Sequence, residues 1–199
     1  SKKNSDSKIA TTKKIANVSL FNFPFTLNLI ASANGSTVPD YSKVFGKSIK
    51  QFAEKDTKIV CVTAAMQIGT GMAPFTEKYP DRYIDVGIAE EHAVTYSAGL
   101  AAGGFKVIVP IYSTFMQRAY DHIFHDALLQ DIPLVYCMDR AGVVGPDGPT
   151  HHGVFDIAFM RSLPGMVITA PKDGNELKNL LATGIQSNKN FSIRYPKAS

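Results

Sequence analysis

Apolar and polar positions follow a regular pattern from Tyr41 to the end of the chain. Stretches in which apolar residues recur at helical spacing alternate with short runs that are rich in β-branched residues. The run 58–63 reads KIVCVT, which is typical of a strand buried on both faces of a sheet. The pattern therefore predicts an α/β domain that is doubly wound, with a mostly parallel sheet and helices on both faces.

The predicted strands are residues 58–63, 83–86, 105–111, 134–138, 167–169 and 191–195. The predicted helices are a first one around residues 44–52 and then 72–79, 89–102, 115–130 and 175–185. The fourth strand is followed by a long loop, residues 140–153, that is rich in glycine and proline. Loops of this length usually carry function.

The first 40 residues do not share the alternating pattern. The formal net charge of +4 lies entirely within the first fourteen residues, so the rest of the chain is neutral and offers no basic field for nucleic acid. The uncharged stretch 15–39 is similar to a secretory signal, but Asn22, Pro24 and Asn28 interrupt it and no apolar span is long enough to cross a membrane. We expect residues 1–40 to be a disordered tail or linker and residues 41–199 to form one domain.

The two cysteines, Cys61 and Cys137, each lie inside an apolar run. Neither belongs to a CxxC pair or to another spacing that is typical of metal ligands. We expect both to be structural thiols, which fits a reducing compartment, the cytoplasm or a plastid.

A glycine turn, residues 69–73, follows the first strand and opens a helix, as a phosphate-binding dinucleotide turn would. The position of the third glycine in that motif is Pro74, which disfavours close packing of the helix on the turn. Dinucleotide binding therefore stays open as a minor alternative.

Two further groups of polar residues lie on predicted helices. Glu90 and Glu91 open the helix 89–102, where two acids can simply complement the helix dipole or can point across the carboxyl edge of the sheet toward a ligand. His122 and His125 are spaced as two ligands of a metal site would be, but no HExxH arrangement is present and a surface role is commoner. Spacing alone assigns neither group a function.

The loop after the fourth strand carries the strongest chemical signal. Its arginine, Arg140, offers a fork for phosphate or carboxylate, His151 is of a residue type that can shuttle protons, and the glycines allow close approach of the backbone to a ligand. The sequence therefore predicts an active-site loop here.

Three segments carry a resemblance to a known family. They are DRYIDVGIAEEHAVTYSAGLAAGG at residues 81–104, YSTFMQRAYDHIFHD at 112–126 and DRAGVVGPDGPTHHGVFD at 139–156. Together they closely resemble the 1-deoxy-D-xylulose-5-phosphate synthase family of isoprenoid synthesis, from about Tyr41 to Lys197. The resemblance implies the thiamine-diphosphate-binding fold of the pyrimidine-domain type, which transketolases and the beta chains of pyruvate dehydrogenase share.

The resemblance also implies roles for the matching residues. Glu90 matches the catalytic glutamate that hydrogen-bonds the ring nitrogen of the cofactor's aminopyrimidine, and Phe115 matches the aromatic residue that stacks on that ring. His151 matches a residue that manages protons at the substrate carbons. The positions that line the substrate site are matched by Tyr112, Arg118, Arg140, Asp147, His151 and Lys197. Lys197 departs from the arginine usual in the family, so it keeps the charge but loses the fork.

In this family the enzyme is a transferase that condenses pyruvate with glyceraldehyde 3-phosphate. The GDG motif that binds the cofactor's diphosphate and Mg²⁺ in the family is not found in this sequence. We therefore expect this chain to hold only the pyrimidine end of thiamine diphosphate, to bind no metal itself, and to need a diphosphate-binding domain in the same or another chain. A homodimer without nucleic-acid or membrane partners is expected, and the alternative is a truncated, inactive domain that serves only oligomerisation.

Overall fold

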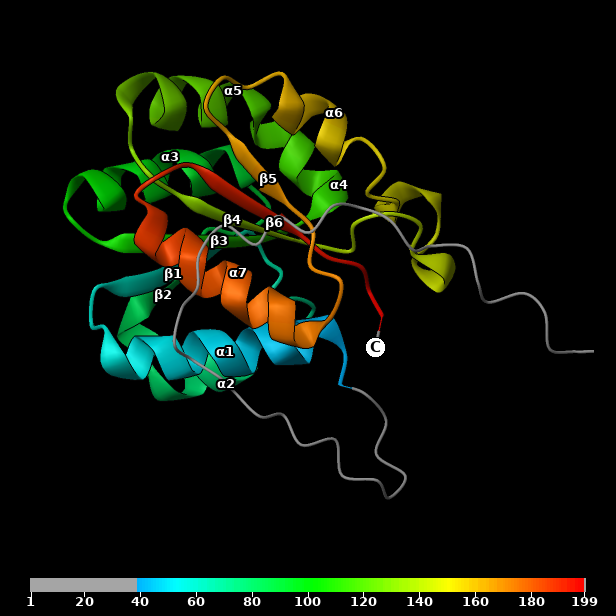
Figure 1. The fold of residues 1–199 in the computed structure, drawn as a ribbon, viewed down its shortest axis with the longest axis horizontal. Coiled ribbons are helices and arrows are strands. Elements are labelled where there is room, and N and C mark those ends of the chain that lie inside the picture. The colour runs from blue at the N-terminus through cyan, green and yellow to red at the C-terminus, as the bar shows by residue number, and fades with distance from the viewer. Residues whose placement is uncertain (1–38, 199) are drawn as a thin grey trace, which may run out of the picture. The chain divides into compact units, whose positions relative to one another are not determined.

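The computed structural model describes residues 39–198, so the expected tail or linker at residues 1–40 lies almost wholly outside the described residues. The described chain forms a six-stranded sheet whose pairings are all parallel, in the order β2-β1-β3-β4-β6-β5 (Figure 1). The strands are β1 Ile59–Thr63, β2 Tyr83–Asp85, β3 Lys106–Tyr112, β4 Val135–Asp139, β5 Val167–Thr169 and β6 Phe191–Arg194. The helices are α1 Tyr41–Lys55, α2 Ala73–Lys78, α3 Glu90–Ala102, α4 Ser113–Met116, α5 Tyr120–His122, α6 Asp156–Arg161 and α7 Gly174–Ser187.

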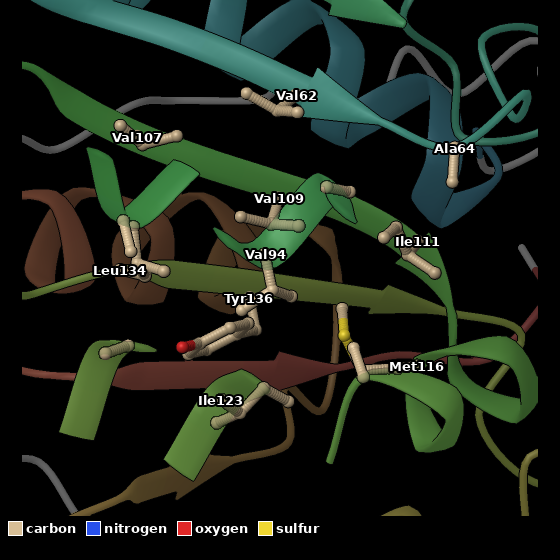
Figure 2. Close-up of a cluster of buried hydrophobic side chains, with 14 of the residues drawn as sticks. Val62, Ala64, Val94, Val107, Val109, Ile111, Met116, Ile123, Leu134 and Tyr136 are labelled. Atoms are coloured by element: carbon tan, nitrogen blue, oxygen red, sulfur yellow. The ribbon is translucent and has the colours of Figure 1, made fainter. Parts of the chain in front are cut away.

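Helices cover both faces of the sheet, which confirms the doubly wound α/β fold. Along β1 the side chains of Ile59 and Cys61 join the buried cluster beneath α1, α2 and α7, whereas Val60 and Val62 join the cluster beneath α3 to α6. This alternation is the two-residue period of a strand, and it explains why the whole strand reads as apolar. Figure 2 shows the second cluster, where Val62, Val109 and other strand residues meet side chains of the covering helices.

The segment 115–130 differs from the single helix that the sequence predicts. The structure begins α4 at Ser113, passes through a 3₁₀ turn and α5, and continues as a π-helix at Ile123–Ala127 and a second 3₁₀ turn. Ala119, Ile123 and Ala127 are nevertheless buried at four-residue spacing, as in one helix. Apolar spacing shows which face is buried, but it does not show which carbonyl accepts each N–H. The change from α-helical to 3₁₀ and π-helical hydrogen bonding could therefore not be predicted from the sequence.

Four short elements of the described residues have no counterpart among the predicted ones. These are α6 and the 3₁₀ turns Pro80–Arg82, Gly145–Asp147 and Pro149–His151. Each is too short to show a periodic pattern, because a helix of six residues completes fewer than two turns.

Candidate active site

The residues singled out from the sequence lie at the carboxyl edge of the parallel sheet, where the strand order reverses. The chain leaves β1 for β2 on one side and then returns to β3 on the other, so the switch point lies between β1 and β3. Ligands of open α/β sheets bind outside the carboxyl ends of strands at such a point. The predicted residues follow the ends of four strands: Glu90 after β2, Tyr112, Phe115 and Arg118 at and after β3, Arg140, Asp147 and His151 after β4, and Lys197 after β6.

Glu90 is the first residue of α3 and is buried, with 1% of its surface exposed. Its Oε1 accepts a hydrogen bond from Nη1 of Arg118 at 2.8 Å. Glu90 thus lies at a helix N-terminus and pairs with an arginine. The neighbouring Glu91 and His92 are more exposed, so Glu90 is the acid of this segment that faces the interior.

An aromatic cluster lies beside Glu90. The guanidinium carbon of Arg118 lies 4.8 Å from the ring centroid of Phe115, and the ring of Phe115 stacks on that of Tyr112 at 6.0 Å. His151 meets Phe115 edge-on, with the centroids 5.2 Å apart, and its Nδ1 lies 2.9 Å from the hydroxyl of Thr150. The Thr150 contact engages Nδ1 of His151.

Arg140 extends the site to the loop after β4. Its guanidinium lies 3.8 Å from the ring centroid of Tyr112, its Nη1 donates to the carbonyl oxygen of Gly69 at 2.8 Å, and its Nε donates to Asp147 at 3.1 Å. The backbone of Arg140 is left-handed, with φ of 60°, a conformation that costs a non-glycine residue about 1 kcal/mol. These contacts hold the strained residue in place and fix its fork over Tyr112.

Asp147 joins Arg140 to the end of the chain. Its second oxygen accepts a hydrogen bond from Nζ of Lys197 at 2.6 Å, and this contact holds the pKa of Asp147 below its ordinary value. All eight predicted residues are therefore linked by direct contacts into one chain that runs from Glu90 to Lys197.

One acidic residue of the site had no role in the sequence interpretation. Asp139, the last residue of β4, is completely buried, and its two oxygens accept hydrogen bonds from the hydroxyl of Ser42 at 2.6 Å and from the N–H of Arg140 at 2.7 Å. Burial raises the pKa of Asp139 to about 6, although Ser42 and Arg140 oppose the shift. The available signal was its position: an acid at the carboxyl end of a central strand, directly before Arg140.

The glycine turn after β1 serves close packing within the chain. A Cβ atom on Gly69 would lie 1.5 Å from the hydroxyl oxygen of Tyr112, and one on Gly71 would lie 2.1 Å from the carbonyl oxygen of Ser42. The turn thus presses against α1 and the tyrosine, which accounts for both glycines without a dinucleotide.

His122 is the last residue of α5, and His125 lies in the π-helix that follows. His125 contacts Asp121, and the Nδ1 atom of His122 is buried without a hydrogen-bond partner in the structure. Within residues 39–198, no group of three or more His, Cys, Asp or Glu side chains could hold a metal ion. In the same part of the chain, no helix is both long and apolar enough to span a membrane.

The site residues fit the pyrimidine ring of thiamine diphosphate. The buried carboxylate of Glu90 and the ring of Phe115 both contact the guanidinium of Arg118, and they offer a hydrogen-bond acceptor and a stacking surface for a flat heterocycle.

Comparison with known proteins agrees with this geometry. Residues 37–199 match the family model of the transketolase pyrimidine-binding domain. The chain is 55% identical over 168 residues to 1-deoxy-D-xylulose-5-phosphate synthase of Gloeobacter violaceus and 53% identical over 164 residues to that of Aquifex aeolicus. These alignments cover 84% and 82% of this chain but 26% of each relative, so the chain spans about a quarter of the length of the curated relatives it matches.

Solved structures show the same fold. A split-gene transketolase described as an inactive beta4 tetramer superposes with a TM-score of 0.72 at 22% identity, over 81% of this chain and 53% of that one. Transketolase of Pichia stipitis in complex with sedoheptulose 7-phosphate superposes with a TM-score of 0.71 at 19% identity, over 81% of this chain and 26% of that one. Fold, site and sequence similarity lead to the same conclusion: the chain belongs to the family of transketolase pyrimidine-binding domains.

Proposed function

We propose that this chain is the pyrimidine-binding domain of a thiamine-diphosphate-dependent 1-deoxy-D-xylulose-5-phosphate synthase. The reaction is the condensation of pyruvate with glyceraldehyde 3-phosphate to 1-deoxy-D-xylulose 5-phosphate and carbon dioxide. The observation that carries the proposal is the single chain of contacts that joins all eight predicted site residues from Glu90 to Lys197. The identity of 53–55% to synthases of this name supports the choice of reaction.

Glu90 and Phe115 would hold the pyrimidine ring. When bound, thiamine diphosphate supplies the nucleophilic carbon and the electron sink for decarboxylation. Glu90 would hold a proton at the ring nitrogen, and its burial would keep bulk water away from that hydrogen bond. Phe115 would orient the ring by stacking, because a flat heterocycle packs face to face on an aromatic side chain.

The opposite end of the contact chain would bind the substrates. Arg140 and Lys197 both pair with Asp147, and they would bind the phosphate of glyceraldehyde 3-phosphate. Arg118 is the third cation, and Tyr112 supports Arg140 from below its guanidinium plane. His151, with Nδ1 engaged by Thr150, moves protons at the carbons derived from pyruvate.

A second domain is part of this proposal. The diphosphate end of the cofactor and Mg²⁺ would be held by a diphosphate-binding domain in the same or another chain, and the assembly would be a homodimer. Loops at the carboxyl edge expose large apolar side chains, including Ile68, Ile88 and Val143, each more than three-quarters exposed. We propose that the diphosphate-binding domain covers these side chains. The free, buried thiols of Cys61 and Cys137 suit a reducing compartment, the cytoplasm or a plastid.

The alternative of a degenerate domain kept only for oligomerisation is less well supported. A domain released from catalysis has no reason to keep a strained Arg140 or a buried Glu90, since each costs stability. Both are present in this chain and both take part in the contact chain.

Carbon dioxide release from pyruvate tests the proposal. The assay contains glyceraldehyde 3-phosphate, thiamine diphosphate and Mg²⁺, with this chain alone and with a separately expressed diphosphate-binding half. We expect activity only in the mixture, and we expect Glu90→Gln to lower turnover by several orders of magnitude. Glu91→Gln is the matched control, because it removes the adjacent carboxylate of the same helical turn and should change turnover little. Near-normal turnover of Glu90→Gln, or silence of a well-folded mixture, would refute the proposal.

A further inference from the structure

Arg118 makes the two contacts that a bound aminopyrimidine would make. Its planar guanidinium lies over the ring of Phe115, and its Nη1 donates a hydrogen bond to Oε1 of Glu90. A protonated aminopyrimidine is likewise flat and carries an N–H donor at its edge. One side chain of the protein thus reproduces both the stacking and the hydrogen bond that the site offers to a ligand.

Glu90 is buried, and its hydrogen-bond partner Arg118 reaches the solvent. The Glu90 side chain is 2% exposed, whereas that of Arg118 is 47% exposed. A ligand that approaches Glu90 from solvent therefore meets the arginine or its neighbours first. Oε1 can accept a second hydrogen bond, but the guanidinium of Arg118 lies over the face of Phe115, so a flat ring cannot stack there until the guanidinium moves.

We propose that in the ligand-free chain Arg118 occupies the pyrimidine subsite, and that binding of the pyrimidine ring displaces it. The displaced guanidinium, no longer paired with Glu90, becomes available to an anionic group of the substrate. This inference rests on the proposed function, because it assumes that Glu90 and Phe115 form the pyrimidine subsite. The consequence is that binding of the ring and binding of an anionic substrate group are coupled, because the ring frees the guanidinium of Arg118 from its pair with Glu90.

A rival arrangement predicts the opposite effect of Arg118 on the affinity for the pyrimidine ring. If Arg118 stays on Oε1 while the ring takes Oε2, the arginine would steady the carboxylate and assist binding. If Arg118 competes, the apparent affinity for the ring is reduced by the fraction of time for which the pair is open. An ion pair with one half-exposed partner contributes up to about 1 kcal/mol, so the closed state, in which Arg118 pairs with Glu90, is favoured about fivefold over the open state.

Thiamine, which carries the aminopyrimidine but no diphosphate, is the probe. Calorimetric titration of the full 199-residue chain compares wild type with Arg118→Met, which keeps the length and apolar stem of the side chain. We expect the variant to bind thiamine about fivefold more tightly. Arg161→Met is the matched control, since Arg161 is an exposed arginine in the last turn of α6, and its affinity should equal that of wild type.

The outcomes separate the inference from the proposed function. Equal or weaker binding by Arg118→Met would overturn the displacement of Arg118 and leave the pyrimidine subsite intact. Binding by neither protein, or binding that Glu90→Gln does not weaken, would overturn the subsite itself. A double-mutant cycle of Glu90→Gln and Arg118→Met in urea unfolding adds a readout without ligand. We expect the double variant to lose less stability than the two single variants together, and strict additivity would contradict the pair.

Discussion

The buried carboxylate of Asp139 makes the stability of this domain depend on pH in a defined direction. Its pKa of about 6 lies about two pH units above the ordinary value of 3.8, because burial disfavours the charged form. The folded chain therefore binds this proton more tightly than the unfolded chain does. The stability contributed by the protonated group is complete below about pH 3.8 and is lost as the pH rises through about 6.

The magnitude follows from the size of the shift. Each pH unit of difference between folded and unfolded pKa corresponds to about 1.4 kcal/mol, so wild type loses about 3 kcal/mol from this group between about pH 4 and pH 7. Asp139→Asn has no charge to bury, keeps an acceptor for the N–H of Arg140 and can still bond the hydroxyl of Ser42. Relative to wild type, the variant should gain about 3 kcal/mol of unfolding free energy over this pH range.

Urea unfolding followed by circular dichroism, at constant ionic strength and several pH values, measures the difference. Other carboxylates titrate in the same range but cancel in the comparison of the two proteins. The attraction between Asp139 and the guanidinium of Arg140, 3.4 Å apart, already lowers the folded-state pKa of Asp139 and is therefore included in the expected gain. A difference that does not change from about pH 4 to pH 7 would refute the reasoning.

Three further changes test other parts of the structure. Gly71→Ala and Gly87→Ala share nearly the same left-handed backbone, with φ of 75° and 74°, but only the first would place Cβ against the carbonyl oxygen of Ser42. Gly71→Ala should therefore lower the unfolding free energy by about 2 kcal/mol more than Gly87→Ala, and equal losses would contradict the close packing of the turn. In the reconstituted enzyme, His151→Ala should lower turnover while the dissociation constant of thiamine diphosphate is unchanged. Loss of cofactor affinity alone would contradict its proposed role. Lys197→Arg should lower the KM for glyceraldehyde 3-phosphate, because a guanidinium binds phosphate through two N–H groups, and an unchanged KM would place the phosphate elsewhere.

The sequence predicted the sheet well because each buried strand carries its own signal. Five-residue runs such as β1 and β4 are apolar on both faces, and helices cover both. The same reasoning missed α6, whose six residues are too few for a period. It also predicted one regular helix for 115–130, because burial at four-residue spacing is compatible with several hydrogen-bond patterns.

The site was predictable as a set of residues and less so as a set of contacts. The composition of the loop after β4 predicted a functional loop. The parallel topology brings the carboxyl ends of β2, β3, β4 and β6 to one edge of the sheet. Ser42 gave no signal, because it reaches Asp139 from a helix 97 residues earlier in the chain. Gly69 and Gly71 resembled a phosphate turn, although in the fold they make room for a tyrosine hydroxyl and a helix carbonyl.

The number of cations in the site does not predict its affinity for phosphate, because each cation is paired with a carboxylate. Each of them contacts a carboxylate: Arg118 with Glu90, Arg140 with Asp139 and Asp147, and Lys197 with Asp147. An anion that enters must compete with these internal partners, which lie at hydrogen-bond distance, or wait until one of them is released. Under the proposed displacement, the pyrimidine ring releases Arg118 and leaves one positive charge without its partner. Because coupling between two ligands is reciprocal, phosphate should then raise the affinity for thiamine as much as thiamine raises the affinity for phosphate. In Arg118→Met both effects should vanish together, because the side chain that couples the two ligands is no longer charged.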